Sequence, residues 1–347
     1  MNRSAYLLRR FLLMFPTFIG ITLVCFALTR LLPGGPVEMR LLRMQGMGEG
    51  AAASLNIRGV ASVTEAQREA LNQKFGFDKP FLSQYGRWLF TNRMGLSLES
   101  YDFPGRTAWK LIREKIPVSL WFGITSLVLS YLVCIPLGIA KALRHGSPFD
   151  MATSLAVLVG YAFPVIALGM ILKALFCGAS ENFWDVFPLG GFESPGYADM
   201  TFFGRFADRA KHMALPLACY VFGNFAMLTL IMKNSLLEQI SADYMRTVLA
   251  KGATFRRAVW RHAFRNSLIP IVTGIGGILT VFFAGSVIIE TIFEIPGMGR
   301  LSLTALTSRD YAVFMALLAL TSSLQLVGNL ISDLCYMLVD PRIHFGK

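Results

Sequence analysis

Six apolar runs without Asp, Glu, Lys or Arg divide this chain of 347 residues. They occupy positions 11–29, 116–140, 151–172, 212–232, 266–289 and 311–332. Each run is 19 to 25 residues long, and an α-helix needs about 20 residues to cross the hydrocarbon core of a bilayer. Because backbone polar groups in lipid have to be paired within their own segment, the runs predict six transmembrane helices. The sequence therefore predicts an all-α, polytopic membrane protein.

Charged residues outside the runs are sorted by loop. The stretches before the first run and after the second and fourth runs are mainly basic, with Arg3, Arg9, Arg10, Lys141, Arg144, Lys233, Arg246, Lys251, Arg256, Arg257, Arg261 and Arg265. The stretches at 173–211 and 290–310 mix acidic and basic residues. This is the positive-inside pattern, and it predicts that both termini are cytoplasmic. A net charge of +12 therefore needs no nucleic-acid partner.

The spans and the charges of the short loops together predict four regions, and the long insertion is placed by the spans on either side of it. The four regions are a cytoplasmic N-terminus with the first span (1–32), a small periplasmic insertion (33–115), a core of spans two to six (116–332) with a cytoplasmic loop at 233–268, and a cytoplasmic tail (333–347). In the insertion, Thr64 is expected to cap a helix that ends at Gly76. Pro80 is expected at a turn, followed by aromatic residues that can pack a small core.

Residues 241–270, here called the basic segment, read SADYMRTVLAKGATFRRAVWRHAFRNSLIP. The local signals predict two short helices. Ser241 is expected to cap the first helix, with Asp243 in its first turn, and Thr254 is expected to cap the second. Gly252 is expected to join them in the left-handed conformation that follows a helix end.

The second predicted helix carries two stripes of side chains. One stripe consists of Arg257, Arg261 and Arg265, and the other of Phe255, Val259 and His262. A docking surface for another protein explains this pattern. A solvated basic face beside the membrane explains it equally well, so the pattern alone leaves both interpretations open.

The basic segment resembles the EAA loop, a cytoplasmic loop of ABC-importer permeases with the pattern E-A-A, three residues, Gly, nine residues, I-x-L-P. Arg246-Thr247-Val248 and Gly252 keep that spacing, whereas His262-Ala263-Phe264-Arg265 stands in place of I-x-L-P, as in the peptide-transporter branch. In that family the loop seats a short helix in a groove of the ATP-binding subunit. The resemblance implies the same coupling role for Asp243, Tyr244, Arg246, Gly252, Phe255, Arg257, Arg261 and His262.

Three further blocks extend the resemblance. The stretch LLPGGPV at 31–37 is similar to L-x-P-G-D-P, with Gly35 in place of Asp, and the chain ends in LVDPRIHF, similar to L-D-P-R-I. Between them, E-x-x-F-x-x-P-G-x-G-R-L and R-D-Y-x-V are matched by Glu290, Phe293, Pro296, Gly297, Gly299, Arg300, Leu301, Arg309, Asp310, Tyr311 and Val313. These blocks resemble the B-type permease subunit of dipeptide and oligopeptide importers, within it the Yej-type oligopeptide and microcin C branch.

The resemblance implies the type I importer fold, located in a bacterial inner membrane. It implies transport of oligopeptides, with peptide-nucleotides of the microcin C type as one candidate cargo, and a nickel or glycoside importer permease as the alternative. The implied partners are a second permease in a heterodimer, two ATP-binding domains that are fused in one chain in the Yej-type system, and a periplasmic substrate-binding protein. ATP and Mg²⁺ would be held by the ATP-binding partner, with no cofactor in this chain.

Residue patterns for catalysis are absent from the sequence. It contains no G-x-x-x-x-G-K-[ST] phosphate loop, no H-E-x-x-H metal pair and no G-x-S-x-G elbow. No catalytic or metal residue is therefore expected, and the substrate path stays unassigned. A stand-alone channel is the remaining rival class, but channels and ion-coupled transporters place charged residues within the spans. The uncharged runs favour energy supplied from outside the membrane.

Overall fold

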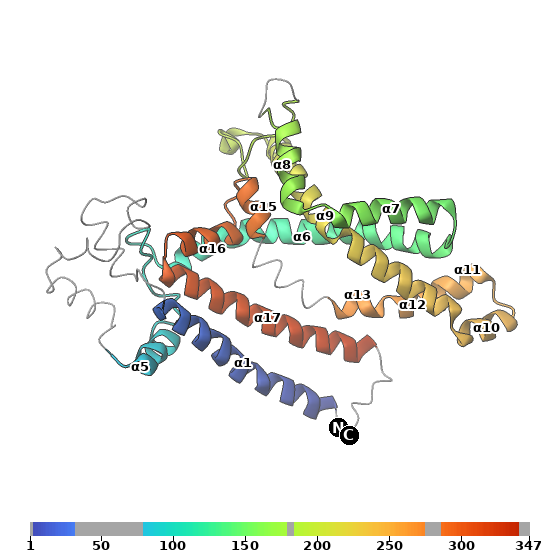
Figure 1. The fold of residues 1–347 in the computed structure, drawn as a ribbon, viewed down its shortest axis with the longest axis horizontal. Coiled ribbons are helices and arrows are strands. Elements are labelled where there is room, and N and C mark those ends of the chain that lie inside the picture. Colours follow the sequence, from blue (N-terminus) through green and yellow to red (C-terminus); the bar gives the residue numbers. More distant parts are fainter. Residues whose placement is uncertain (1–2, 32–78, 179–183, 275–285, 340–347) are drawn as a thin grey trace. The chain divides into compact units, whose positions relative to one another are not determined.

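The computed structural model describes residues 3–31, 79–178, 184–274 and 286–339 (Figure 1). These residues form helices and turns, and their β-type pairing is limited to two isolated bridges, Glu99 with Thr107 and Cys177 with Asp185. The all-α expectation is confirmed for this part of the chain. Outside the described residues lie the predicted helix at 64–76, the 31–37 block beyond its first residue, positions 275–285 of the fifth run and the C-terminal block from position 340 onward.

In the part of the chain that the structure describes, three helices are long and apolar enough to cross a membrane by themselves. They are α1 (Arg3–Leu31), α6 (Ala108–Leu143) and α17 (Tyr311–Val339). α6 begins eight residues before the apolar run at 116–140, and Thr107 accepts a hydrogen bond from the backbone N–H of Lys110 at 3.3 Å. The extra turns extend the helix beyond the apolar run.

Two further spans are bent. α7 (Pro148–Ala162) and α8 (Val165–Phe176) meet at 94°, and α9 (Phe202–Ser241) bends by 45° between its halves. Counting each bent pair as one span gives five among the described residues. The run at 266–289 lies partly outside them, so the total of six spans stays a prediction.

The break between α7 and α8 follows from one proline. Phe163 and Pro164 both have extended backbone angles, with ψ of 121° and 129°. A proline has no N–H and disfavours the helical conformation in the residue before it. Pro136, by contrast, lies inside the continuous helix α6. A proline in an apolar run therefore marks a possible break and does not fix one.

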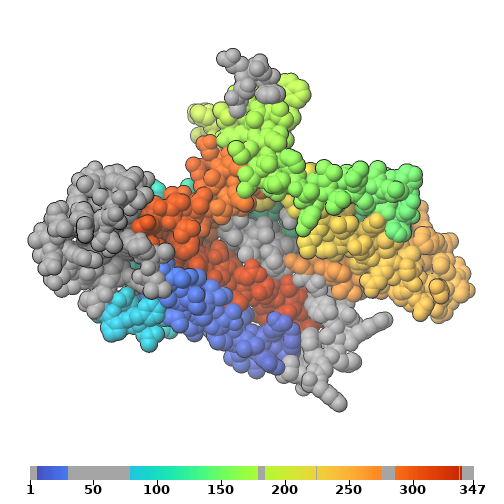
Figure 2. All heavy atoms as spheres, viewed as in Figure 1, coloured from blue at the N-terminus to red at the C-terminus, as the bar shows by residue number. Residues whose placement is uncertain are grey.

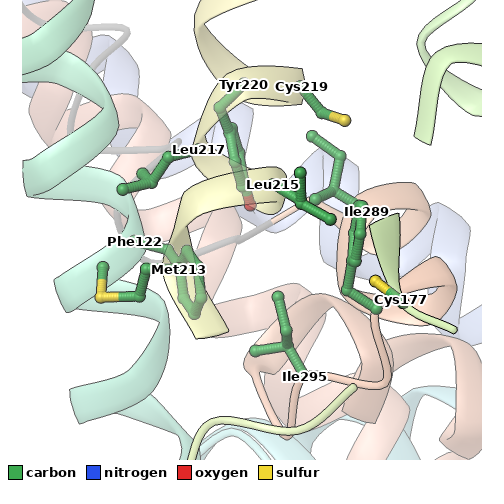
Figure 3. Packing of buried hydrophobic residues seen from close by; sticks show 10 residues of the cluster. Phe122, Cys177, Met213, Leu215, Leu217, Cys219, Tyr220, Ile289 and Ile295 are labelled. Carbon is green, nitrogen blue, oxygen red and sulfur yellow. The ribbon is translucent and has the colours of Figure 1, made fainter. Parts of the chain in front are cut away.

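The chain divides into two compact units, which are described separately. One contains Met1–Arg10, Ile116–Arg300 and Leu324–Lys347, and the other contains Phe11–Lys115 and Leu301–Ser323. In the first unit, a buried core gathers side chains from α6, α8, α9 and α15 (Val287–Ile292) (Figure 3). The rings of Phe122 on α6 and Tyr220 on α9 stack with centroids 6.5 Å apart. This core holds these helices together.

The polar start of α9 is tied to the loop before it, which contains a 3₁₀ turn (Tyr197–Asp199). Arg209 lies over the rings of Phe192 and Tyr197, at 5.0 and 4.7 Å from their centroids. Asp208 accepts hydrogen bonds from the backbone N–H and the hydroxyl of Ser194, at 3.0 and 2.6 Å. The loop is thus fixed to the helix by charge-assisted contacts.

In the second unit, aromatic residues pack on the first and last helices. Tyr85 of α5 (Phe81–Gly86) and Trp88 of a π-helical turn (Arg87–Thr91) surround Phe26 of α1 and contact α17 through Met315. The hydroxyls of Tyr85 and Thr22 are 2.8 Å apart. Sequence reasoning predicted a small core within the insertion, but these aromatics use the membrane helices as their base. Pro80 precedes α5, at the predicted turn.

Candidate functional site

The first helix of the basic segment is α10 (Asp243–Ala250), with Asp243 in its first turn as predicted. The prediction of Ser241 as its cap is wrong. α9 continues through Ser241, and the chain turns at Ala242, which has φ −69° and ψ 148° and no side chain that can cap. The serine was chosen because hydroxyl side chains favour this position, yet the preceding helix keeps it in its own last turn.

The junction between the two helices matches the prediction. Gly252 has φ +86°, the left-handed conformation, and its N–H donates to the carbonyl oxygen of Leu249 at 2.9 Å. Thr254 then caps the next helix by accepting from the backbone N–H of Arg257 at 3.4 Å. The glycine is needed here because a β-carbon disfavours this conformation.

The second helix contains an irregular turn that its sequence does not reveal. α11 (Phe255–Ala258) runs into a π-helical turn (Val259–Ala263), followed by α12 (Phe264–Ser267) and α13 (Ile269–Thr273). A π-turn shifts the helical register, because it bonds residues five apart instead of four. The predicted stripe of Phe255, Val259 and His262 is therefore wrong. Val259 is buried, whereas Phe255 and His262 are exposed.

One face of the basic segment packs on the ends of two long helices. Met245 of α10 and Val259 lie in one buried cluster with Met232 and Leu236 of α9 and Ile139 of α6. Each of these five residues is at most 8% exposed. The segment is therefore mounted on α6 and α9 through a continuous apolar core.

Tyr244 belongs to this mounted side and not to the free face. Its side chain is half-buried against the cluster, and its hydroxyl donates to the Gln239 side-chain oxygen on α9 at 3.0 Å. Sequence reasoning placed Tyr244 among the coupling residues by its position in the motif. The structure gives it a contact within the chain, which positions α10.

The opposite face is exposed and rich in arginine, and the segment forms part of the molecular surface drawn in Figure 2. It presents the predicted residues Asp243, Arg246, Phe255, Arg257, Arg261 and His262, together with Arg256, Trp260 and Arg265. Asp243 and Arg246 are 3.8 Å apart with side chains 98% and 84% exposed, so their pairing contributes little stability. Five arginines and two aromatic rings are thus left free to meet a partner.

Trp260 was not among the predicted residues. Its ring is 48% exposed and lies edge-on to Phe264, with centroids 5.3 Å apart. Tryptophan and arginine are the residue types that most often dominate the binding energy of protein interfaces. The sequence does contain a signal for this residue: Trp260 stands directly before Arg261 in a charged stretch. A large apolar side chain in such a stretch indicates a contact with another surface.

This site is suited to binding and not to catalysis. Among the described residues, no group of three or more His, Cys, Asp or Glu side chains is placed to hold a metal ion. The exposed groups are mainly guanidinium donors and apolar rings, which recognise acidic and apolar surfaces. The exposed face of the basic segment is therefore suited to contact an acidic and apolar surface.

Comparison with known proteins gives the class of this molecule. The model of the family of binding-protein-dependent transport system inner membrane components matches residues 134–345, more than half of the chain. The chain belongs to this family. It is a multi-pass inner-membrane permease subunit of an ABC importer, and ATP hydrolysis is carried out by separate subunits.

Relatives match along almost the whole chain. The chain is 36% identical over 363 residues to the peptidoglycan transport system permease protein YejB of Agrobacterium fabrum, with 99% of each chain covered. It is 33% identical to the inner membrane ABC transporter permease protein YejB of Escherichia coli O157:H7, with the same coverage. It is 32% identical to the oligopeptide transport system permease protein AppB of Bacillus subtilis, with 99% and 100% covered.

Proposed function

We propose that this chain is the B-type permease of an importer that carries oligopeptides into the cytoplasm. The similarity to the oligopeptide transport permease AppB of Bacillus subtilis supports a peptide cargo over the nickel or glycoside alternatives. Peptide-nucleotides of the microcin C type form a narrower candidate within the same class. A stand-alone channel is disfavoured because the family is binding-protein-dependent.

The observation that carries the proposal is the two-sided basic segment. Its buried face is held by Met232 and Leu236 of α9, while its other face leaves five arginines and the rings of Phe255 and Trp260 exposed. A firmly mounted surface can pass movement to the helices beneath it, whereas a loose basic loop cannot. We infer that this face docks on an ATP-binding subunit whose groove is apolar with an acidic rim.

The complete importer then needs partners that supply energy and cargo. We infer a second permease, two ATP-binding domains, separate or fused, and a periplasmic substrate-binding protein. ATP and Mg²⁺ are held by the ATP-binding domains. The basic segment and both termini lie in the cytoplasm, where ATP is available, and the loops at 33–115 and 173–211 face the periplasm.

Docking is tested by photo-cross-linking in the assembled importer. A photoreactive amino acid replaces Trp260, and the control variant carries it at Leu155, an α7 residue that is 63% exposed and distant in sequence from the basic segment. We expect the Trp260 probe to capture the ATP-binding subunit and the Leu155 probe not to capture it. Equal capture from both positions, or capture from Leu155 alone, would contradict the proposed surface.

The charge of the surface is tested separately. Replacing Arg257 and Arg261 together by Glu places carboxylates against the expected acidic rim, so we expect the affinity for the ATP-binding subunit to fall by about tenfold or more. The matched control is Arg205→Glu with Lys211→Glu at the start of α9, two exposed positions in the 173–211 loop region. An unchanged affinity in the first variant would show that this face is only a solvated basic surface.

A further inference from the structure

Three charged side chains are buried together near the end of α6, at the start of α7 and in the C-terminal part of α9. Asp150 of α7 accepts hydrogen bonds from the Lys233 ammonium of α9 through both carboxylate oxygens, at 2.7 and 2.8 Å. The Nζ of Lys141 on α6 lies 3.3 Å from the Asp150 Oδ1 atom. The side chains of Lys141, Asp150 and Lys233 are 0%, 6% and 11% exposed. We call these three residues the ion cluster.

The remaining polar groups of the ion cluster are also satisfied. Lys141 donates to the hydroxyls of Thr153 and Ser154 at 2.9 and 2.7 Å and to the backbone carbonyl of Asp150 at 3.2 Å. The Asp150 Oδ2 atom additionally accepts from the backbone N–H of Gly146 at 3.2 Å. Each contact joins α7 or the turn before it to a neighbouring helix or turn, so the ion cluster fastens three elements at one point.

Removing one partner from such a cluster leaves a buried charge without compensation, which is strongly unfavourable. Moving α7 away from α9 would likewise leave the charges of Asp150 and Lys233 without their partners. The helices are also closely packed one turn away, because a β-carbon at Gly138 of α6 would lie 2.6 Å from the Met232 β-carbon of α9. These parts of α6, α7 and α9 are therefore expected to move as one body.

The ion cluster adjoins the base of the basic segment. Met232 precedes Lys233 in the chain and Ala142 follows Lys141, and both belong to the apolar cluster that holds Met245 and Val259. A displacement of the basic segment therefore meets the ion cluster directly. On its other side, α7 leads to the 94° break before α8.

We propose that the ion cluster transmits movement of the basic segment to α7, with Asp150 as the positioning residue. The inference rests on the proposed function, in which the basic segment docks on an ATP-binding subunit. Its new element is the route: the docking surface acts through α9 and the Asp150 carboxylate on the broken helix pair α7 and α8. Asp150 contacts neither peptide nor ATP in this scheme.

The test uses the whole importer in proteoliposomes and measures peptide transported per ATP hydrolysed. Asp150→Asn and Lys233→Met each remove one charge while keeping a side chain of similar size, and we expect each to lower that ratio about fivefold or more. Lys233→Arg keeps the positive charge, and we expect this variant to retain most of the wild-type transport ratio. The control is Glu114→Gln, which breaks an ion pair between Arg106, 33% exposed, and Glu114, 44% exposed. The transport ratio of this variant should stay at the wild-type value.

A second readout follows the movement itself. Spin labels on Leu155 of α7 and Glu238 of α9, both exposed, report the distance between the two helices by pulsed electron resonance. In the otherwise unmodified importer we expect this distance to stay constant when ATP binds. In Asp150→Asn we expect it to change or broaden on ATP binding, because α9 then moves without α7. If Asp150 only stabilised the fold, its substitution would not change how the distance between the labels responds to ATP.

The outcomes separate the inference from the proposed function. If the unmodified importer transports peptide and Asp150→Asn lowers only the amount of assembled complex, with a wild-type ratio and a constant label distance, the transmission role is wrong. If the unmodified importer transports no peptide with an active ATP-binding subunit and binding protein, the proposed function fails, and the inference falls with it. Lowered ratios in both charge-removing variants, with recovery in Lys233→Arg, support the route.

Discussion

The Glu290 carboxylate accepts a hydrogen bond from the backbone N–H of Arg300, 2.8 Å away, at the start of α16 (Met298–Thr307). A β-carbon at Gly297 would lie 2.5 Å from the carboxyl carbon of Glu290. Ser119 of α6 completes the arrangement, since its hydroxyl donates to Glu290 at 3.3 Å and accepts from the backbone N–H of Met298 at 2.8 Å. The E-x-x-F-x-x-P-G-x-G-R-L block is therefore a buried helix cap with a glycine that admits the carboxylate.

The stability of this cap is expected to depend on pH. Glu290 directly follows the fifth apolar run and is 1% exposed, and burial raises its pKa to about 7. The folded protein therefore holds this proton more tightly than the unfolded chain, whose glutamates have a pKa near 4.5. The stabilisation is fully present below about pH 4.5 and is lost as the pH rises through 7, by roughly 2 to 3 kcal/mol.

Thermal unfolding of the purified subunit in detergent at pH 5 and pH 8 checks this expectation. Glu290→Gln keeps the shape of the side chain without the titration, so the fall in melting temperature between pH 5 and pH 8 should be smaller than in the wild type. Glu99→Gln removes an exposed carboxylate and should leave that fall unchanged. A Glu290→Gln profile that parallels the wild type would refute the assignment.

Asp310 is expected to be the main fastening of the loop at 100–103 in the second unit. It is 2% exposed, its Oδ1 accepts from the Val313 N–H at 3.2 Å, and its Oδ2 accepts from the Tyr101 N–H at 3.0 Å and from the Ser100 hydroxyl. Asp310→Ala removes the acceptor of the buried Ser100 hydroxyl and Val313 N–H, so we expect a loss of about 1 to 3 kcal/mol, measured as a lower melting temperature.

The control for Asp310 is Asp199→Ala, an exposed residue of the 3₁₀ turn. It should leave the melting temperature within about one degree of the wild type, because surface changes away from special contacts are usually small. Susceptibility of the 100–103 loop to limited proteolysis should rise only in Asp310→Ala. Equal melting temperatures for both variants would show that the loop is held by other contacts.

The sequence predicted the features that depend on local chemistry. Gly252 and Thr254 take their expected roles because a left-handed glycine and a hydroxyl cap act within a few residues. The long helices follow from hydrophobicity and length in the same way. These features can be predicted without knowing which helices pack against each other.

Features that depend on neighbouring elements were missed. Tyr244 and Val259 face inward because α9 and α6 lie beneath them, and the π-turn at Val259–Ala263 changes the register that a regular helix would have. The pairing of Asp150 with Lys233 joins residues 83 positions apart. The sequence offered only the weak signal that both residues stand at the ends of apolar runs.

The orientation in the membrane is tested by cysteine labelling. In a variant whose five native cysteines are replaced by alanine, single cysteines are introduced at Phe203 and Phe255, which are 81% and 52% exposed. We expect a membrane-impermeant maleimide to label position 203 in spheroplasts and position 255 only after permeabilisation, because the positive-inside pattern places the basic segment in the cytoplasm. Labelling of position 255 in sealed spheroplasts would overturn the orientation.

Substitution of Gly252 tests whether the junction in the basic segment aims the docking face. A β-carbon at this position meets no atom within 4 Å, so its cost comes from the φ of +86° alone, about 1 kcal/mol for most residues and more for a branched one. We expect Gly252→Val to insert at near-normal levels while peptide uptake collapses, because α11 is misaimed. Asparagine tolerates the left-handed region, so Gly252→Asn should retain more uptake than Gly252→Val.

The matched control for this substitution is Gly105→Val. Gly105 also has a left-handed φ, +78°, and a β-carbon there likewise meets no atom within 4 Å. The conformational strain is therefore similar, but this glycine lies in the second unit, far in sequence from the docking face. Uptake should stay close to the wild-type rate in Gly105→Val. If both valine variants lose uptake equally, or if Gly252→Val transports at the wild-type rate, the junction does not aim the docking face. If Gly252→Val is absent from the membrane, the glycine is required for folding instead.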